Sequence, residues 1–326
     1  MRRRVLVASL AAAVWPLTTS AQQARTPVVG FLGLGSPTTV GPALLAAFHR
    51  GLAEGGFTNG HNVAVDYVWA EGLYDRLPTL AAELVRRRVD VIVAAGGITA
   101  ALAAKGATTS IPIVILAGSD PVEWGLVASV NRPGGNVTGV VQLVVEVEAK
   151  RLELLRELVP GTPTVALLAN PKRPGSERQQ KDVEAAARAL GLKMLLVEAD
   201  DDDDLAPAFD AARAGAGALI VSADPFFFAR RDRIVALAEH HSLPTMYFFR
   251  EFVAAGGLVS YGSNLGNAYH HIGVYAGKIL KGLNPAEMPM VQQSDKLELV
   301  INLKTARVLG IQVPATLQTS ADEVIE

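Results

Sequence analysis

Residues 89–117 read VDVIVAAGGITAALAAKGATTSIPIVILA, and they hold one complete unit of the pattern that decides the fold. Val89–Ala95 and Ile113–Ala117 are short, apolar and rich in β-branched residues, which favours two buried strands. Between them, Gly96-Gly97 breaks the first run and Thr99–Thr108 has the length and composition of a helix. A strand, a helix and a second strand in this order predict a βαβ unit of a parallel sheet.

The same alternation extends in both directions through the first half of the chain. Further strands are expected at Val28–Leu32, Val63–Val68 and Val137–Val141, and further helices at Pro42–Glu54 and Tyr74–Arg88. Together with residues 89–117, these segments predict a first lobe of α/β architecture.

A second run of the same alternation follows. Its expected strands are Val165–Ala169, Met194–Glu198, Ala218–Ser222 and Thr245–Phe248, and its expected helices are Glu146–Leu158, Gly175–Leu190, Asp204–Ala214 and Arg230–His241. The end of the chain adds a helix at Asn267–Lys281, a strand at Leu297–Asn302 and a short helix at Thr305–Leu309, too little to bury an apolar face alone. We therefore predict two Rossmann-like lobes with parallel sheets, joined by several chain crossings, around a cleft that closes on a small ligand.

Composition excludes several classes of protein. The chain has 326 residues, with 30 Lys and Arg against 32 Asp and Glu, so it lacks the basic excess expected of a nucleic-acid partner. It has no cysteine, which excludes disulfides, thiolate metal sites, Cys nucleophiles and a lipid-anchored N-terminal Cys. Beyond the N-terminus no apolar run approaches the ~18 residues of a membrane span.

The N-terminus has the three parts of a secretory signal. Arg2–Arg4 precede an apolar run at Val5–Trp15, and Thr19-Ser20-Ala21 supplies small residues for cleavage. An uncleaved anchor is the alternative, but an apolar run of about eleven residues is short for that function. We expect residues 1–21 to be a signal peptide, cleaved after Ala21 on export to the periplasm.

Several segments, in order along the chain, resemble one family. They are Ile111–Val114, Ser119–Val122, Arg132–Gly139, Arg250–Leu258, Lys278–Gly282 and Glu298–Ala306. The chain thereby resembles the ABC-transporter solute-binding proteins of the tryptophan/tyrosine-type family, which have the type I periplasmic binding protein fold. The resemblance implies a receptor that delivers a small-molecule solute to an inner-membrane ABC permease, and relatives take aromatic amino acids. Where such relatives often have Thr-Pro after the third strand, this chain has Gly96-Gly97-Ile98-Thr99, which leaves the solute open.

On this interpretation the first lobe comprises residues 27–140 plus about 264–302. The second comprises about 141–263 plus about 303–326. We expect a monomer that needs no cofactor and no metal.

Ligands of open parallel sheets bind at the carboxyl ends of the strands, so the loops there supply the candidate residues. After the first strand, Ser36 and Thr38 could bind a ligand or cap the next helix, and the G-x-G-x-x-T pattern lacks the third glycine of a dinucleotide site. After the third strand, Gly96, Gly97 and Thr99 open a helix whose amides could bind a carboxylate without any arginine nearby; an ordinary glycine turn is the alternative.

After the fourth strand, Ser119 and Asp120 are expected at the cleft. The Asp120 carboxylate could accept a hydrogen bond from a ligand ammonium, or it could accept one from the backbone of its own turn. In the second lobe, Asn170 directly follows the strand expected at Val165–Ala169, so it is also a candidate ligand-binding residue at the cleft.

The most suggestive group is Asp224 with the aromatics that follow it. Asp224 could accept a hydrogen bond from a ligand ammonium, and Phe226 and Phe228 could contact a flat or apolar side chain of the ligand. At least one of the phenylalanine rings should instead pack in the hydrophobic core. Tyr247 and Glu251 complete the candidate wall, and Glu251 could equally be a first-turn helix carboxylate. These residues predict an amino acid or related small carboxylate, possibly aromatic, as the solute.

The remaining motifs do not indicate catalysis. The run Asp200–Asp204 is better read as a solvated helix cap than as a calcium loop, and the adjacent pairs His240-His241 and His270-His271 lack zinc spacing. No G-x-S-x-G, H-E-x-x-H or complete P-loop is present. We therefore expect no enzyme, with an α/β enzyme or a ligand-sensing domain using the same cleft as the alternatives.

Overall fold

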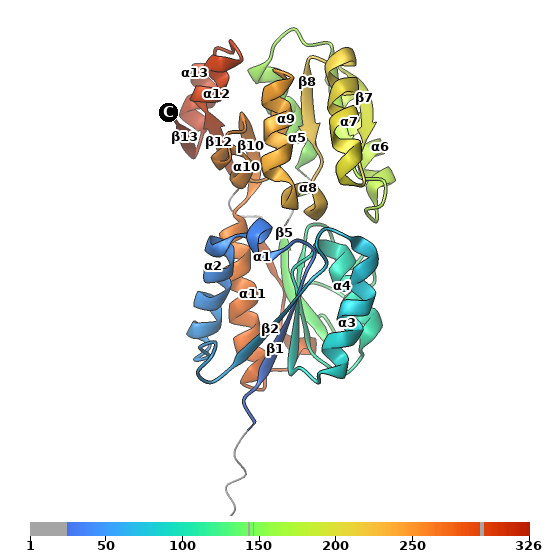
Figure 1. The fold of residues 1–326 in the computed structure, drawn as a ribbon, viewed down its shortest axis with the longest axis vertical. Coiled ribbons are helices and arrows are strands. Elements are labelled where there is room, and N and C mark those ends of the chain that lie inside the picture. Colours follow the sequence, from blue (N-terminus) through green and yellow to red (C-terminus); the bar gives the residue numbers. More distant parts are fainter. Residues whose placement is uncertain (1–24, 143, 146, 294–296) are drawn as a thin grey trace, which may run out of the picture.

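The computed structural model describes residues 25–142, 144–145, 147–293 and 297–326, so the predicted signal peptide lies outside the described residues. Figure 1 shows two lobes stacked along the long axis of the molecule, with the C-terminus in the second lobe. Both lobes are α/β, with helices on the faces of a mostly parallel sheet, and this part of the predicted fold is confirmed.

The first lobe is built on a six-stranded parallel sheet. In the order in which they pair, its strands are β11 (Val291–Gln293), β5 (Val137–Gln142), β4 (Ile113–Ala117), β3 (Val91–Ala94), β1 (Val28–Gly33) and β2 (Ala64–Trp69). Its helices are α1 (Pro37–Val40), α2 (Pro42–Glu54), α3 (Leu77–Arg86) after a 3₁₀ turn at Tyr74–Arg76, α4 (Gly97–Ala107) and α11 (Leu265–Leu280). Helices α2 and α11 cover one face of the sheet, and α3 and α4 cover the other (Figure 1).

Glycines let α11 lie directly against α2. A Cβ on Gly51 would be 1.9 Å from the His270 carbonyl oxygen, and a Cβ on Gly273 would be 2.1 Å from that of Phe48. Any larger residue at either position would push the helices apart. A helix from late in the sequence thereby completes the core of the first lobe.

The second lobe is built on a seven-stranded sheet. In pairing order, its strands are β13 (Glu323–Ile325), β12 (Leu297–Asn302), β10 (Val259–Ser263), β9 (Thr245–Tyr247), β8 (Ala218–Val221), β6 (Thr164–Ala169) and β7 (Lys193–Glu198). Its helices are α5 (Glu148–Leu158), α6 (Ser176–Ala189), α7 (Asp202–Gly215), α8 (Pro225–Ala229), α9 (Arg231–His240), α10 (Arg250–Ala254), α12 (Leu303–Val308) and α13 (Ala315–Ser320). A 3₁₀ turn at Pro285–Glu287 precedes β11.

One segment lies in the lobe opposite to the one we expected. The sequence places residues 297–302 in the first lobe, but as β12 they pair antiparallel with β10 in the second sheet, Val300 opposite Ser260. The preceding strand, β11, pairs with β5 in the first sheet, so the chain crosses between these two strands. The antiparallel pair also departs from the purely parallel sheet that the sequence predicts.

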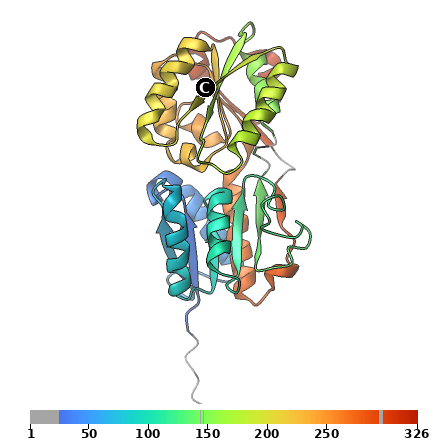
Figure 2. The same cartoon turned by 90° about the vertical axis from the view of Figure 1, so that its right-hand side faces the viewer.

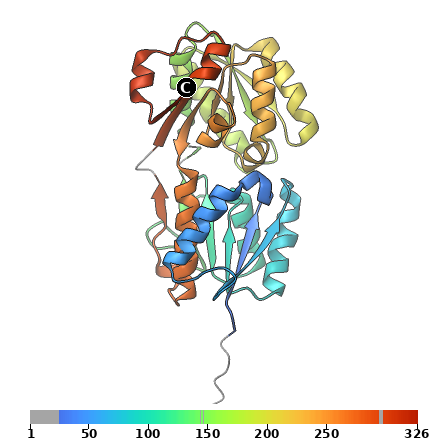
Figure 3. The same cartoon turned by 60° about the vertical axis from the view of Figure 1, so that its left-hand side comes forward.

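The chain crosses from one lobe to the other after β5, after β10 and after β11. Figures 2 and 3 show β5, α11 and β11, the first-lobe elements that flank these crossings, toward one side of that lobe. Away from that side, contacts between side chains of the two lobes hold the interface together. Within the described ranges, no helix has both the length and the apolar character needed to cross a bilayer.

Candidate functional site

A cavity of about 100 Å³ lies between the lobes, and we call it the central pocket. The first lobe lines it with Ala95, Gly97, Ile98, Thr99, Leu116, Gly118 and Ser119, from the ends of β3 and β4 and the start of α4. The segments after β5 and β10 add Gln142, Val144, Val145, Leu265 and Tyr269. The second lobe lines it with Arg173, Ala223, Asp224, Pro225, Phe228, Phe248 and Phe249. The pocket therefore lies at the carboxyl ends of strands from both sheets, as the fold rule predicts.

The second-lobe wall of the central pocket is aromatic. Phe228 comes from α8, and Phe248 and Phe249 follow β9. The rings of Phe228 and Phe249 meet edge to face, with centroids 5.8 Å apart. These buried rings pack against one another and form an apolar wall, to which Ile98 and Leu116 of the first lobe add apolar side chains.

Asp224 is a buried carboxylate on the same wall. It caps α8 by accepting from the backbone N–H groups of Phe226 and Phe227, and both of its oxygens lie 2.9 Å from the hydroxyl oxygen of Tyr74, in the first lobe. The Nε atom of Arg173 is 3.9 Å from Asp224 Oδ2. Burial raises the pKa of Asp224, while Arg173 and the Tyr74 hydroxyl act to lower it. Asp224 is thus already hydrogen-bonded within the protein.

Arg173 supplies positive charge to the pocket. It lies in the loop between β6 and α6, and its side chain is 11% exposed. Its Nη1 donates to the Pro174 carbonyl, but its Nη2 is buried and finds no acceptor among the described residues. Gly97 and Thr99 lie in the first turn of α4, whose early N–H groups have no partner within the helix. An anion between Arg173 and this helix end would be favoured from both lobes.

Other contacts also join the lobes. The Nη1 atom of Arg231 donates to the carbonyl of Thr39, and Arg178 pairs with Glu123 at 2.7 Å. The Arg178–Glu123 pair is exposed, so it adds little to the free energy of closing, whereas the Tyr74–Asp224 hydrogen bond involves a buried carboxylate. The lobes are closed on each other in this structure.

Of the residues that the sequence suggested, the structure brings five to the central pocket. They are Gly97, Thr99, Ser119, Asp224 and Phe228. Gly97 and Thr99 lie at the start of α4, Ser119 follows β4, and Asp224 and Phe228 come from the loop and helix after β8.

Four first-lobe residues lie outside that pocket. Ser36 caps α1 by accepting from Thr39 N, and its hydroxyl is 2.8 Å from that of Thr38, which is exposed. Gly96 is buried just before α4, where a Cβ would come within 3.0 Å of Leu34 N. Asp120 Oδ1 accepts from Val122 N at 2.9 Å, which closes its own turn. Local hydrogen bonding and close packing account for these four.

Four second-lobe residues also lie elsewhere. Asn170 is buried and accepts from Lys172 N. Phe226 is buried beneath the Arg230 guanidinium, 3.9 Å from its ring centroid.

Tyr247, expected at the cleft wall, is fully buried and stacks on Phe252 with centroids 4.8 Å apart. Glu251 lies in the first turn of α10, where burial raises its pKa and its Oε2 accepts no hydrogen bond from any described residue. In place of Tyr247, the next two residues along the chain, Phe248 and Phe249, reach the pocket.

Sequence reasoning missed several lining residues. Arg173 ends the basic segment Asn170-Pro171-Lys172-Arg173 directly after β6, which was a usable signal. Leu265 and Tyr269 belong to α11 and reach the pocket only because that helix starts at a crossing between the lobes. Nothing local in the sequence marks those two as pocket residues.

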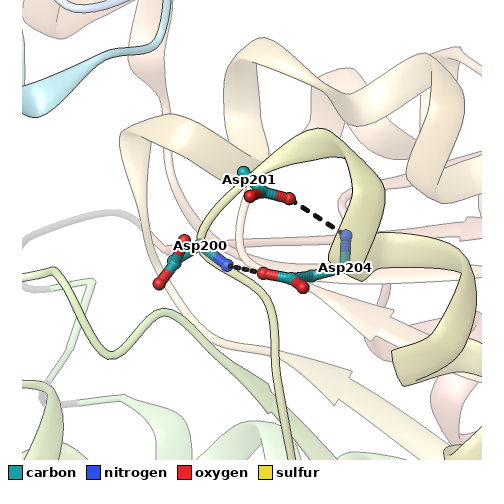
Figure 4. A group of neighbouring side chains, drawn as sticks. All are labelled: Asp200, Asp201 and Asp204. Carbon is teal, nitrogen blue, oxygen red and sulfur yellow. Dashed lines mark hydrogen bonds between the residues drawn. The ribbon is translucent and has the colours of Figure 1, made fainter.

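The acidic run before α7 forms a cluster on the second lobe, drawn in Figure 4. Asp201 is the N-cap of α7 and accepts from Asp203 N and Asp204 N, while Asp204 accepts from Asp200 N at 3.2 Å. Lys172 Nζ lies 2.8 Å from Asp200. One carboxylate oxygen from each of the three residues in Figure 4 lies within 4.8 Å of the other two. The hydrogen bonds and the ion pair just described are typical of a capped helix N-terminus.

Comparison with known proteins assigns the family. The profile described as "ABC transporter substrate binding protein" matches residues 41–325. The chain is 26% identical over 277 residues to the tyrosine-binding protein of Clostridioides difficile (strain R20291), covering 85% of this chain and 78% of that protein.

Two solved structures are similar over most of the chain. One is the ABC domain of Streptococcus pneumonia in complex with L-Trp, with TM-score 0.82, and the other is a conserved domain protein of Vibrio cholerae, with TM-score 0.81. Each is 26% identical and covers 92% of this chain and 100% of its own. The fold is that of type I periplasmic binding proteins, and the chain belongs to the family of ABC transporter substrate-binding proteins.

Proposed function

We propose that this protein is the periplasmic receptor of an ABC importer that captures an amino acid, or a related small carboxylate with an apolar or aromatic side chain. The solute would bind in the central pocket and be delivered to an inner-membrane permease. The observation that carries this proposal is the pairing, in one interlobe cavity, of a buried guanidinium nitrogen without an acceptor and an aromatic wall.

The carboxylate of the solute would bind between Arg173 and the first turn of α4. Arg173 offers Nη2, and Gly97, Ile98 and Thr99, at the start of α4, line the same pocket from the other lobe. A charged hydrogen bond in a closed cleft contributes about 1.5–3 kcal/mol. Because the two groups belong to different lobes, a carboxylate between them would favour the closed form.

The side chain of the solute would lie against Phe228, Phe248 and Phe249. Two similar proteins support this class of solute, since one is a tyrosine-binding protein and the other was solved with L-Trp. An apolar ligand surface of this kind is stabilised by roughly 25 cal/mol per Å² removed from water.

The test is calorimetry on the chain without residues 1–21, with the twenty amino acids and their des-amino acids as ligands. For any ligand that binds, Arg173→Gln should lower the affinity about ten- to a hundredfold, because it removes one charged partner. Lys172→Gln is the matched control: it removes one positive charge from the neighbouring position, but Lys172 is 55% exposed and pairs with Asp200 outside the pocket. Its affinity should stay within about twofold of wild type.

The proposal fails if no carboxylate ligand binds, or if Arg173→Gln binds as tightly as Lys172→Gln. Conversion of a bound ligand to product would favour the enzyme alternative instead.

A further inference from the structure

A second cavity adjoins the central pocket, and a buried carboxylate in its wall suggests a ligand contact that rests on the proposed function. The second cavity has a volume of about 310 Å³ and shares Ser119, Val145 and Arg173 with the central pocket. Its other lining includes Glu148 from α5 and Gln179 from α6. We call it the polar chamber.

Glu148 is the buried carboxylate of the polar chamber. The residue is 2% exposed. Its Oε1 accepts from the Gln179 side-chain amide and from Ala223 N, and lies 3.8 Å from the Nη1 atom of Arg151. Its Oε2 is buried and accepts no hydrogen bond from any described residue. A buried carboxyl oxygen without a hydrogen-bond partner is unfavourable by more than an ordinary hydrogen bond is favourable, so it calls for a partner.

The other carboxylates of the two cavities already have partners. Both oxygens of Asp224 lie 2.9 Å from the Tyr74 hydroxyl, and the cap of α8 adds two N–H donors. Glu123 pairs with Arg178 at 2.7 Å, and Asp182 is 72% exposed to solvent. Among the described lining residues, Glu148 therefore has the carboxylate oxygen most in need of a donor.

Arg173 lines both cavities, so an anion bound to it would lie where they meet. Glu148 and Arg173 influence each other electrostatically, as do Asp224 and Arg173. Two buried arginines, Arg151 and Arg173, lie beside two buried carboxyl groups, Glu148 and Asp224. A zwitterion adds no net charge to this buried group, whereas a simple carboxylate or a simple amine adds one.

We propose that Glu148 binds the ammonium group of the solute, through Oε2, while Arg173 binds its carboxylate. The zwitterionic end of an amino acid then occupies the junction of the two cavities, and its side chain extends toward Phe228 and Phe249. This assignment replaces Asp120 and Asp224 as the ammonium-binding group, because the first closes its own turn and the second is bonded to Tyr74.

The experiment uses three probes of one shape: L-tryptophan, indole-3-propionate, which lacks the ammonium, and tryptamine, which lacks the carboxylate. L-tyrosine with its two matching analogues is the second set. Affinities are measured by calorimetry for wild type, Glu148→Gln and Glu148→Asp, with folding checked by circular dichroism. Glu153→Gln is the matched control, since it removes a carboxylate of the same helix that is exposed, pairs with Lys150 and lines neither cavity.

Wild type should bind the amino acid at least tenfold more tightly than the des-amino acid. Glu148→Gln should weaken amino-acid binding about ten- to a hundredfold and leave des-amino-acid binding unchanged or stronger, because only the former loses a charged partner. Glu148→Asp, with a shorter side chain, should fall between, and it decides the question if Glu148→Gln does not fold. Glu153→Gln should bind all probes like wild type.

The proposal is overturned if Glu148→Gln and Glu148→Asp keep wild-type affinity for the amino acid, or if wild type binds the des-amino acid equally well. Neither result contradicts the proposed function as a receptor for a small carboxylate. If wild type binds neither the amino acid nor the des-amino acid of either set, the amino-acid function fails, and the role of Glu148 fails with it.

Discussion

Replacing Tyr74 with phenylalanine should loosen the closed arrangement of the lobes. Tyr74 belongs to the first lobe, and its hydroxyl lies 2.9 Å from both oxygens of Asp224, which is 1% exposed in the second lobe. The substitution keeps the ring and removes only this donor. It therefore perturbs the contact between the lobes while leaving the packing within each lobe in place.

The size of the effect follows from the burial of the carboxylate. A hydrogen bond to a charged group contributes about 1.5–3 kcal/mol. In the open form both groups regain water, and Asp224 keeps its two backbone donors in either form, so the lower end of that range applies. About 1.5 kcal/mol corresponds to roughly a tenfold shift of the equilibrium toward the open form.

Two measurements detect such a shift, whichever form dominates in the free protein. If the free protein is mostly closed, the radius of gyration of Tyr74→Phe from small-angle scattering should exceed that of wild type. If it is mostly open, ligand affinity should fall about tenfold, because closing then carries the extra unfavourable free energy. In both cases a saturating ligand should restore the compact form.

Tyr67→Phe is the control. The Tyr67 hydroxyl is 2.8 Å from His49 Nε2. Tyr67→Phe therefore removes the same hydroxyl group as Tyr74→Phe does, but from a hydrogen bond within the first lobe. Tyr67→Phe should match wild type in both measurements. If Tyr74→Phe also matches wild type in radius and in affinity, the Tyr74–Asp224 contact does not hold the lobes together.

Two further predictions concern Gly97 and Glu251. Gly97 has φ +71°, and a Cβ there would lie 3.0 Å from Pro225 Cγ in the other lobe. Gly97→Ala should therefore lower the free energy of unfolding by about 1–2 kcal/mol in a urea titration and also weaken ligand binding. Unchanged values for both quantities would contradict this prediction. Burial raises the pKa of Glu251 above its ordinary value of 4.5, so the stability that this carboxyl contributes is fully present below 4.5 and is lost as the pH rises through the raised pKa. Glu251→Gln should thus melt at a higher temperature than wild type near neutral pH, with the difference vanishing toward pH 4.5; a difference that does not change with pH would show that the charge is not the cause.

The regular elements of the fold were predictable because their sequence patterns are local. Pro42–Glu54 and Leu297–Asn302 were expected at the bounds that the structure gives, since each has an apolar periodicity with clear breaks. Val259–Ser263 was missed, because a segment of mixed polarity becomes a strand only through its pairing with β9 and β12. The lobe to which residues 297–302 belong depends on that same long-range pairing.

The candidate site was predictable at the level of loops rather than side chains. Gly97 and Ser119 follow from the rule that ligands bind at the carboxyl ends of strands. Tyr247 and Phe248 are neighbours, yet one is core and the other lines the pocket, and the sequence does not show where β9 ends. Glu148 and Arg173 meet only when α5 and the loop after β6 pack together, so a search along the chain did not connect them.

The docking of α11 against α2 determines the order in which this protein can fold. His270 and Glu54, bonded at 2.8 Å, are 216 positions apart, and Gly51 and Gly273 meet at the same helix pair. Until residue 280 is available, one face of the first sheet has only half of its helical cover. The first lobe is therefore completed only after most of the second lobe has been synthesised, and contacts this distant in sequence are expected to make folding slow. A chain in transit across a membrane would keep its first lobe unfinished until its last quarter emerged.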